Sequence, residues 1–194
     1  NVLHLWERDC SVQRRNQKVI EVAPSMKLNS KLRESITGYA TKLAKQIGYS
    51  NAGTMEFLVS SKGEIFFLEL NKRLQVEHGI SEMITGIDLV EMQLRVAAGG
   101  TLPFKQKEIE AKGFAIEARV YAEDPETFLP SPGTIVNVYE PPASEFVRID
   151  SCLYSGAEVS VYYDPLLSKV MCWGPTLEDA RIRLLATLDE ITVD

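Results

Sequence analysis

The feature that most constrains the fold is a predicted β-hairpin in the first half of the chain. Two strands, at residues 54–59 and 64–70, are joined by a short polar segment that ends in Gly63. Glycine tolerates the positive φ that a two-residue turn requires, and a turn centred there places Glu56 opposite Glu69. Like charges directly opposite each other destabilise a sheet. The sequence therefore predicts an unfavourable pair that needs a compensating partner.

A divalent cation would supply that partner. Mg²⁺ prefers one or two carboxylate ligands, with phosphate oxygens completing its coordination. In the same register Leu58 and Phe67 lie on the carboxylate face, so we expect an apolar floor beside the cation.

Alternation of polar and apolar residues predicts that the second strand continues beyond the hairpin. The polar positions of this row are Glu69, Asn71, Arg73, Gln75 and Glu77. Such a row could carry a metal ion, an oxyanion bound by a forked guanidinium and a neighbouring base. A solvent-exposed strand is the alternative interpretation, and the two remain about equally supported.

The other predicted elements divide the chain into two halves around a linker at 99–112. The first half carries strands at 2–6 and 18–22 in one sheet, a helix with Ser30 as its N-cap that ends near Gly48, and a helix at 88–98. The second half carries short strands at 114–121, 134–139, 146–150, 158–163 and 168–173. A last helix begins at Thr176, whose capping box closes on Asp179.

Composition excludes several classes of protein. The 194 residues are 45% hydrophobic and carry a net charge of -6, which favours one or two globular domains and gives no reason to expect nucleic-acid binding. No apolar run is long enough for a membrane span, and the first residues predict no signal peptide. Three cysteines without C-x-x-C spacing favour a reducing compartment. We expect the cytoplasm, with the mitochondrial matrix as the alternative.

Three smaller groups of residues have both a functional and a structural interpretation. The basic residues Arg14, Arg15 and Lys18 could hold phosphate or bicarbonate, although a charged loop is usually solvated. His78 could act as a base, although a lone histidine is more often a structural hydrogen-bond partner. On the strand at 114–121, Glu117, Arg119 and Tyr121 share one face, and surface salt bridging is the simpler interpretation there.

Several long strings resemble the biotin carboxylase family along essentially the whole chain. They are ERDCSVQRR at 7–15, FLELNKRLQVEH at 67–78, EMITGIDLV at 82–90, and ARVYAEDP followed by FLPSPG at 118–133. The resemblance implies an α+β fold. Residues 1–112 would be the later part of an ATP-grasp domain, an antiparallel sheet with flanking helices. Residues 113–194 would be a truncated biotin carboxylase C-terminal domain, mostly antiparallel β with a terminal helix.

The resemblance also implies an activity. Bicarbonate would attack the γ-phosphate of ATP to give carboxyphosphate, with Mg²⁺ or Mn²⁺ as cofactor. The carboxyl group would then pass to biotin on a carrier protein or domain. A carboxyltransferase component and a homo-oligomeric assembly are the other expected partners, with no nucleic acid and no membrane. The final acyl acceptor is chosen outside this sequence.

Roles for individual residues follow from their positions in the family strings. Glu56, Glu69 and Asn71 would hold the metal ion, while Gln13, Asn16 and Leu58 would contact the nucleotide. Bicarbonate would be bound by Lys18, Arg73, Gln75 and Val76, the last through its backbone. Glu77 would deprotonate bicarbonate, and Arg119 would stabilise the biotin enolate.

The sequence departs from the family in ways that leave other readings open. Asn16 and Gly79 stand where the family usually has histidine and proline, Lys72 replaces a small polar residue, and the family's N-terminal domain and glycine-rich ATP lid are absent. We therefore expect this chain to be inactive by itself. One alternative is a noncatalytic fragment or homologue that dimerises. Another is a different ATP-grasp carboxylate–amine ligase, which would keep Glu56 and Glu69 without needing Lys18, Arg73, Glu77 and Arg119.

Overall fold

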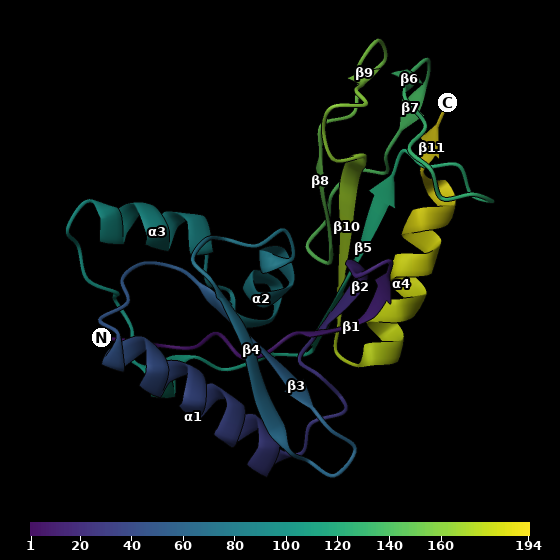
Figure 1. Cartoon of the computed structure of the whole chain (residues 1–194). Helices are drawn as coiled ribbons and strands as arrows, with labels where there is room; N and C mark the ends of the chain where they lie inside the picture. Colours follow the sequence, from purple (N-terminus) through teal and green to yellow (C-terminus); the bar gives the residue numbers. More distant parts are fainter. The chain divides into compact units, whose positions relative to one another are not determined.

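The computed structural model describes all 194 residues and divides the chain into two compact units. Unit 1 comprises Asn1–Asp9 and Ala23–Lys112, and unit 2 comprises Cys10–Val22 and Gly113–Asp194. Each unit combines helices with antiparallel strands, as the predicted α+β class requires (Figure 1). None of the helices has the length and apolar character needed to cross a bilayer.

Unit 1 contains the predicted hairpin and the helices around it. Its elements are α1 (Ser30–Gln46), β3 (Thr54–Val59), β4 (Ile65–Asn71), α2 (His78–Thr85), α3 (Leu89–Ala97) and the short 3-10 helix η1 (Gln106–Glu108). Helix α1 begins one residue earlier than its predicted cap implies, because the side chain of Asn29, and not Ser30, accepts from the Leu32 N–H. Helix α3 has the expected cap, since Asp88 accepts from the Glu91 N–H at 2.8 Å.

The hairpin has the predicted pairing of Glu56 with Glu69, but its turn differs from the predicted one. Its loop is longer than two residues, because the Ser60 N–H donates to the Glu64 carbonyl at 2.9 Å. A register shift next to Glu56 compensates, and Glu56 still faces Glu69. Beyond the shift Phe57 faces Phe67, with their rings 5.8 Å apart in an edge-on contact. Phe67 therefore lies on the face of Phe57 and not on the predicted carboxylate face, whereas Leu58 keeps the face of Glu56 by alternation along β3.

Two predicted strand segments in unit 1 are not strands. Residues 2–6 form no strand, because the N–H groups of His4 and Trp6 bond to side chains, to Gln106 Oε1 at 2.8 Å and His4 Nδ1 at 3.3 Å. Strand β4 ends at Asn71, so the predicted continuation to Glu77 is also wrong. The chain turns there and starts α2, a helix that the alternating pattern concealed.

Unit 2 is built on one antiparallel sheet. Its strands lie in the order β1 (Asp9–Arg14), β2 (Gln17–Ala23), β5 (Phe114–Tyr121), β10 (Leu166–Gly174) and β8 (Val147–Ser151). The turn between β1 and β2 consists of Arg15 and Asn16, both with positive φ. Asparagine adopts this conformation more readily than most residues, so Asn16 suits the turn that joins the two strands.

Helix α4 (Leu177–Glu190) covers one face of this sheet (Figure 1). Thr176 and Asp179 form the predicted capping box, which fixes the start of the helix. The core between helix and sheet is apolar. Its buried residues are Ile116, Ala118, Val170, Cys172, Ala180 and Leu184. Alternation along β5 therefore leaves Glu117, Arg119 and Tyr121 on the face that α4 does not cover.

The remaining strands of unit 2 are shorter than predicted. Strand β6 (Gly133–Thr134) pairs with β9 (Glu158–Val159), and β7 (Val138–Tyr139) pairs with β11 (Thr192–Val193). The predicted strand at 158–163 stops early because its aromatic residues are on the surface, with Tyr162 89% exposed. The apolar alternation there marks exposed rings, not a buried strand face.

Candidate active site

The opposed carboxylates of unit 1 are linked by neutral amides. The Asn71 side-chain Nδ2 donates to Glu56 Oε1 at 3.2 Å and to Glu69 Oε1 at 2.8 Å. Gln75 Nε2 also donates to Glu56 Oε1, at 2.9 Å. Two carboxylates and two amides from β3, β4 and the following loop therefore form one connected network, the carboxylate cluster.

The donor set of the carboxylate cluster fits a hard cation. The structure contains no group of three or more His, Cys, Asp or Glu side chains arranged to hold a metal ion. A cation here would rest on Glu56, Glu69 and an amide oxygen, and would need further oxygen ligands. This is the pattern that Mg²⁺ adopts with nucleotide phosphates. Turning the Asn71 amide over would present its oxygen where its Nδ2 now contacts both carboxylates.

The loop after β4 places the remaining predicted residues of unit 1 at different depths. Arg73 is exposed, and its guanidinium donates to the Leu74 carbonyl at 3.1 Å. Gln75 and Glu77 are buried, with 5% and 2% of their surface exposed. Glu77 is the N-cap of α2, where the helix dipole stabilises a carboxylate, and makes no side-chain cap bond. Leaving the strand thus buries Glu77 and keeps Gln75 within reach of Glu56.

The contacts of His78 are those of a structural hydrogen-bond partner and not of a base. Its Nδ1 lies 2.8 Å from the Gln75 carbonyl oxygen, and its Nε2 lies 3.8 Å from Glu82. These contacts tie the first turn of α2 to the preceding loop, which helps hold Glu77 and Gln75 in place.

Arg8 is a member of this region that the motif reasoning did not single out. Its guanidinium donates to Gln75 Oε1 at 2.7 Å, to Ser81 Oγ at 2.9 Å and to Thr54 Oγ1 at 3.3 Å. These acceptors belong to the loop, α2 and β3. No local pattern identifies such a residue, because its three partners are 46 to 73 positions away along the chain.

The uncovered sheet face of unit 2 holds a buried ion pair centred on Arg119. Arg119 Nη2 donates to Glu21 Oε1 on β2 at 2.5 Å, and its Nε lies 3.9 Å from Glu117 Oε1. Both glutamates are fully buried, so the expectation of surface salt bridging is wrong. Burial alone would lower the pKa of Arg119, but the Glu21 carboxylate and Tyr121 raise it above its usual value.

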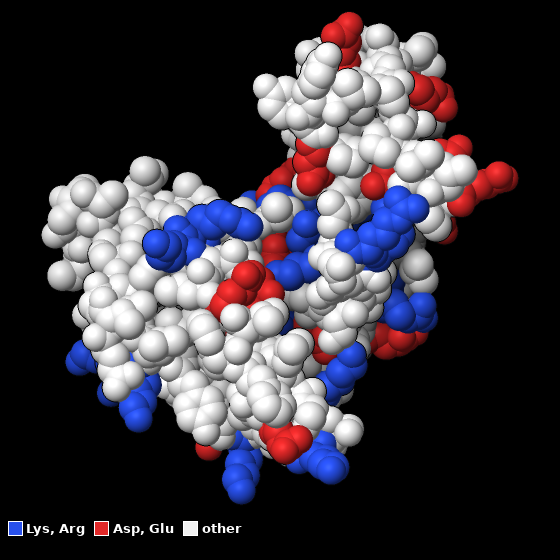
Figure 2. Space-filling model, viewed as in Figure 1, with Lys and Arg blue, Asp and Glu red and all other residues white.

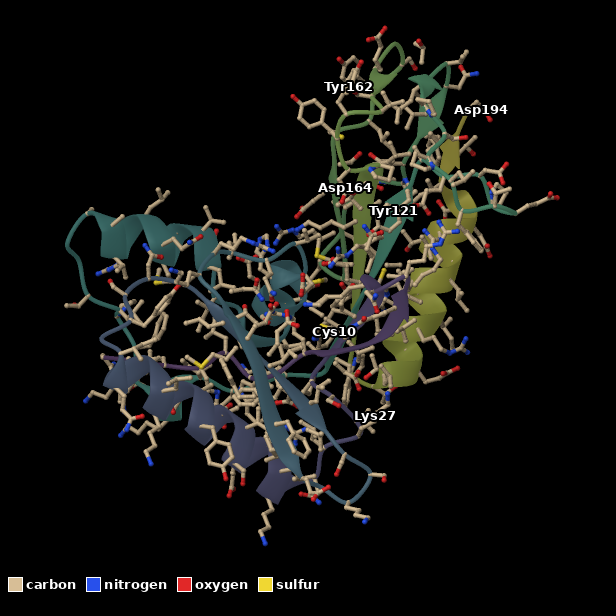
Figure 3. The ribbon with its side chains drawn as sticks, viewed as in Figure 1. Cys10, Lys27, Tyr121, Tyr162, Asp164 and Asp194 are labelled. Atoms are coloured by element: carbon tan, nitrogen blue, oxygen red, sulfur yellow. The ribbon has the colours of Figure 1, made fainter.

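Tyr121 connects two of the predicted site residues of unit 2. Its hydroxyl donates to the Lys18 carbonyl at 3.3 Å, and its phenol oxygen accepts from Arg119. Burial raises the pKa of Tyr121 above its usual value despite the opposing effect of Arg119, so the hydroxyl stays protonated at neutral pH. Figure 3 labels Tyr121 on β5.

Arg14 at the end of β1 and Arg15 in the β1–β2 turn both make contacts within unit 2. Arg14 forms an ion pair with Glu123, and its guanidinium lies over the Phe128 ring at 4.4 Å. Arg15 donates to the carbonyls of Thr127 and Phe128, each at 3.2 Å. These contacts favour a structural role for both arginines over anion binding.

The predicted nucleotide-contacting residues are spread over both units. In unit 2, Gln13 is exposed and donates to the Cys10 carbonyl at 2.9 Å, and Asn16 lies in the turn. In unit 1, Leu58 is 58% exposed on β3.

Figure 2 shows acidic and basic side chains intermixed on the visible face, without one large patch of a single sign.

Two family models match successive parts of the chain, and the first of them includes the Cys10–Val22 segment of unit 2. Residues 1–105 match the model "Carbamoyl-phosphate synthase L chain, ATP binding domain", and residues 117–194 match "Biotin carboxylase C-terminal domain". The chain belongs to the biotin carboxylase family.

Relatives of known sequence and structure agree with this assignment. The chain is 51% identical over 194 residues to biotin carboxylase 2 of Bacillus subtilis and 47% identical over 190 residues to the 2-oxoglutarate carboxylase small subunit of Hydrogenobacter thermophilus. These matches cover 100% and 97% of the chain but 44% and 40% of those proteins. The chain therefore spans less than half the length of these relatives.

Solved structures of the family resemble the whole chain. The biotin carboxylase domain dimer of the Hydrogenobacter thermophilus 2-oxoglutarate carboxylase, in complex with MgADP and bicarbonate, matches with a TM-score of 0.97 and 46% identity. A Campylobacter jejuni biotin carboxylase complex matches with a TM-score of 0.95 and 45% identity. Each covers 100% of this chain and 43% of the other.

Proposed function

We propose that this chain supplies part of the site at which a biotin carboxylase uses ATP and bicarbonate to carboxylate biotin on a carrier. The observation that carries the proposal is the carboxylate cluster, in which Glu56 and Glu69 face each other and share the Asn71 amide. A relative of the same family was solved with MgADP and bicarbonate. A bound Mg²⁺ or Mn²⁺ would neutralise phosphate charge and orient the γ-phosphate.

The residues of the chain would divide the remaining work. Glu56, Glu69 and Asn71 would hold the cation, and Gln13, Asn16 and Leu58 would contact the nucleotide. Lys18, Arg73, Gln75 and the Val76 backbone would bind bicarbonate. Glu77 would take the proton of bicarbonate as a bicarbonate oxygen attacks the γ-phosphate, which breaks the bond between the β- and γ-phosphates and gives carboxyphosphate and ADP. Arg119 would stabilise the biotin enolate, since preorganised positive charge is most effective where negative charge develops.

The proposed domain organisation and partners follow from the same family. Residues 1–112 would belong to an ATP-grasp domain and residues 113–194 to the biotin carboxylase C-terminal domain. A carrier protein or domain would present biotin, and a carboxyltransferase would use the product. A dimer is the expected assembly, because the relative with MgADP and bicarbonate is one. The proposed location is the cytoplasm. The mitochondrial matrix is the alternative, because some relatives are named as mitochondrial.

The proposal is tested by Glu77→Gln in the full-length native protein. We expect bicarbonate-dependent ATP cleavage to fall by at least about 10²-fold, the scale of a removed general base, while the KM for ATP changes little. Glu34→Gln, an exposed acid on α1, is the matched control and should retain the wild-type rate. Equal rates for Glu77→Gln and the control would show that Glu77 is only part of the scaffold.

A further inference from the structure

Gln75 occupies a position in unit 1 where the direction of its amide matters. Its Nε2 donates to Glu56 Oε1 at 2.9 Å, and its Oε1 accepts from Arg8 at 2.7 Å. An amide has an acceptor at one end and two N–H donors at the other, so only one of its two orientations suits these partners.

The chemistry of the two partners determines that orientation. An arginine guanidinium has five N–H donors and no acceptor, whereas an ionised carboxylate has only acceptors. Turning the Gln75 amide over would place its NH₂ against the Arg8 guanidinium and its oxygen against the Glu56 carboxylate. Both contacts would be repulsive, so Arg8 holds the amide oxygen on its own side.

This orientation leaves the Gln75 NH₂ group with donor capacity. One of its two N–H groups donates to Glu56. The second N–H can donate to an anion that approaches the NH₂ end of the Gln75 amide. Gln75 is 5% exposed, so an N–H donor there is already desolvated and its bond to an anion gains strength.

Arg8 is itself fixed by parts of unit 1 outside this loop. It donates to Ser81 on α2 at 2.9 Å and to Thr54 on β3 at 3.3 Å. Three acceptors on three elements restrict the guanidinium to one position, from which it can restrict Gln75.

We propose that Arg8 is a positioning residue for bicarbonate: it fixes the Gln75 amide so that its NH₂ group faces the anion. This inference rests on the proposed function, in which Gln75 binds bicarbonate. It adds that Arg8 acts on the anion through Gln75 and does not touch it.

A double-mutant cycle in the full-length native protein tests this route. Gln75→Ala and Arg8→Met should each raise the KM for bicarbonate about tenfold, the scale of one hydrogen bond to a charged group, while the KM for ATP stays within about twofold. Because both changes remove the same interaction, Arg8→Met should add less than about twofold in the Gln75→Ala background. Additive increases would overturn the proposal, since Arg8 would then act independently of Gln75.

Ser81→Ala is the matched control, because it removes another Arg8 partner at a similar distance but leaves Gln75 intact. Because Arg8 keeps its bonds to Gln75 and Thr54 in this variant, the bicarbonate KM should change by less than about twofold, even if thermal unfolding shifts. A rise equal to that of Arg8→Met would assign the effect to general support of the region and contradict a specific action on Gln75.

A binding measurement separates this inference from the proposed function. Bicarbonate is titrated while NMR follows the Gln75 side-chain amide in wild-type protein and in Arg8→Lys, which keeps the charge and is less disruptive than Arg8→Met. We expect saturable shifts in the wild type and a several-fold higher Kd in Arg8→Lys. Identical titrations overturn the role of Arg8. Wild-type protein that binds bicarbonate at Gln75 without cleaving ATP would instead refute the proposed function.

Discussion

The two charged regions of the molecule organise their acids differently. In unit 1, Glu56 and Glu69 face each other and share the neutral amide of Asn71. In unit 2, the fully buried Glu21 is paired with the guanidinium of Arg119 at 2.5 Å. A neutral amide can orient two carboxylates, but it adds no positive charge. The donor set of unit 1, two carboxylates joined by an amide, fits a divalent cation, whereas the buried acid of unit 2 is paired with an arginine.

The sharpest test of this contrast is removal of the buried acid of unit 2. Glu21→Ala leaves the Arg119 guanidinium buried without its main counter-ion, so we expect about 3–5 kcal/mol of lost stability. Equilibrium urea unfolding of the full-length protein measures the loss. Glu178→Ala, which breaks the exposed pair with Arg181, is the control and should leave the midpoint unchanged. Equal unfolding midpoints for both variants would show that the buried Glu21–Arg119 pair contributes no more stability than the exposed pair.

A smaller effect is expected from Tyr121→Phe in the same region. The change removes only the hydroxyl that joins the Lys18 carbonyl to Arg119, so about 1 kcal/mol of stability should be lost. Urea unfolding again provides the measurement, with Tyr139→Phe, a half-exposed tyrosine on β7, as the matched control. A Tyr121→Phe variant as stable as this control would mean that the bridge is not formed in solution.

Removal of an acid from unit 1 should act in the opposite direction. Glu69→Gln relieves the repulsion with Glu56 and retains an oxygen that can accept from Asn71. In buffer free of divalent cations we expect the variant to be more stable by about 0.5 kcal/mol. A clear loss of stability in a urea titration would indicate that the opposed carboxylates are already compensated, and the contrast with unit 2 would fail.

Local sequence patterns were sufficient where the structure depends on neighbouring residues. The strand Phe114–Tyr121 and the capping box of Thr176 and Asp179 have the predicted positions. Both follow from alternation or from a cap within a few residues. The opposition of Glu56 and Glu69 was also predicted, but with the wrong turn, because a longer loop and a register shift cancel each other.

The errors arise where distant contacts decide the structure. Alternation could not show that β4 ends at Asn71 or that Glu77 occupies the N-cap position of α2. The loop between these residues is held by the bonds of Gln75 to Arg8 and Glu56. The segment at 2–6 fails as a strand because its backbone bonds to side chains, including Gln106. Burial of Glu117 and Glu21 was equally invisible, because it depends on tertiary packing.

The central claim is that the opposed glutamates hold a divalent cation together with nucleotide, and calorimetry tests it most directly. Mn²⁺ is titrated into the full-length native protein with ADP present, for wild type, Glu69→Gln and the surface control Glu34→Gln. We expect saturable heats for the wild type and the control, and none for Glu69→Gln. Equal titration curves for all three proteins would contradict the account.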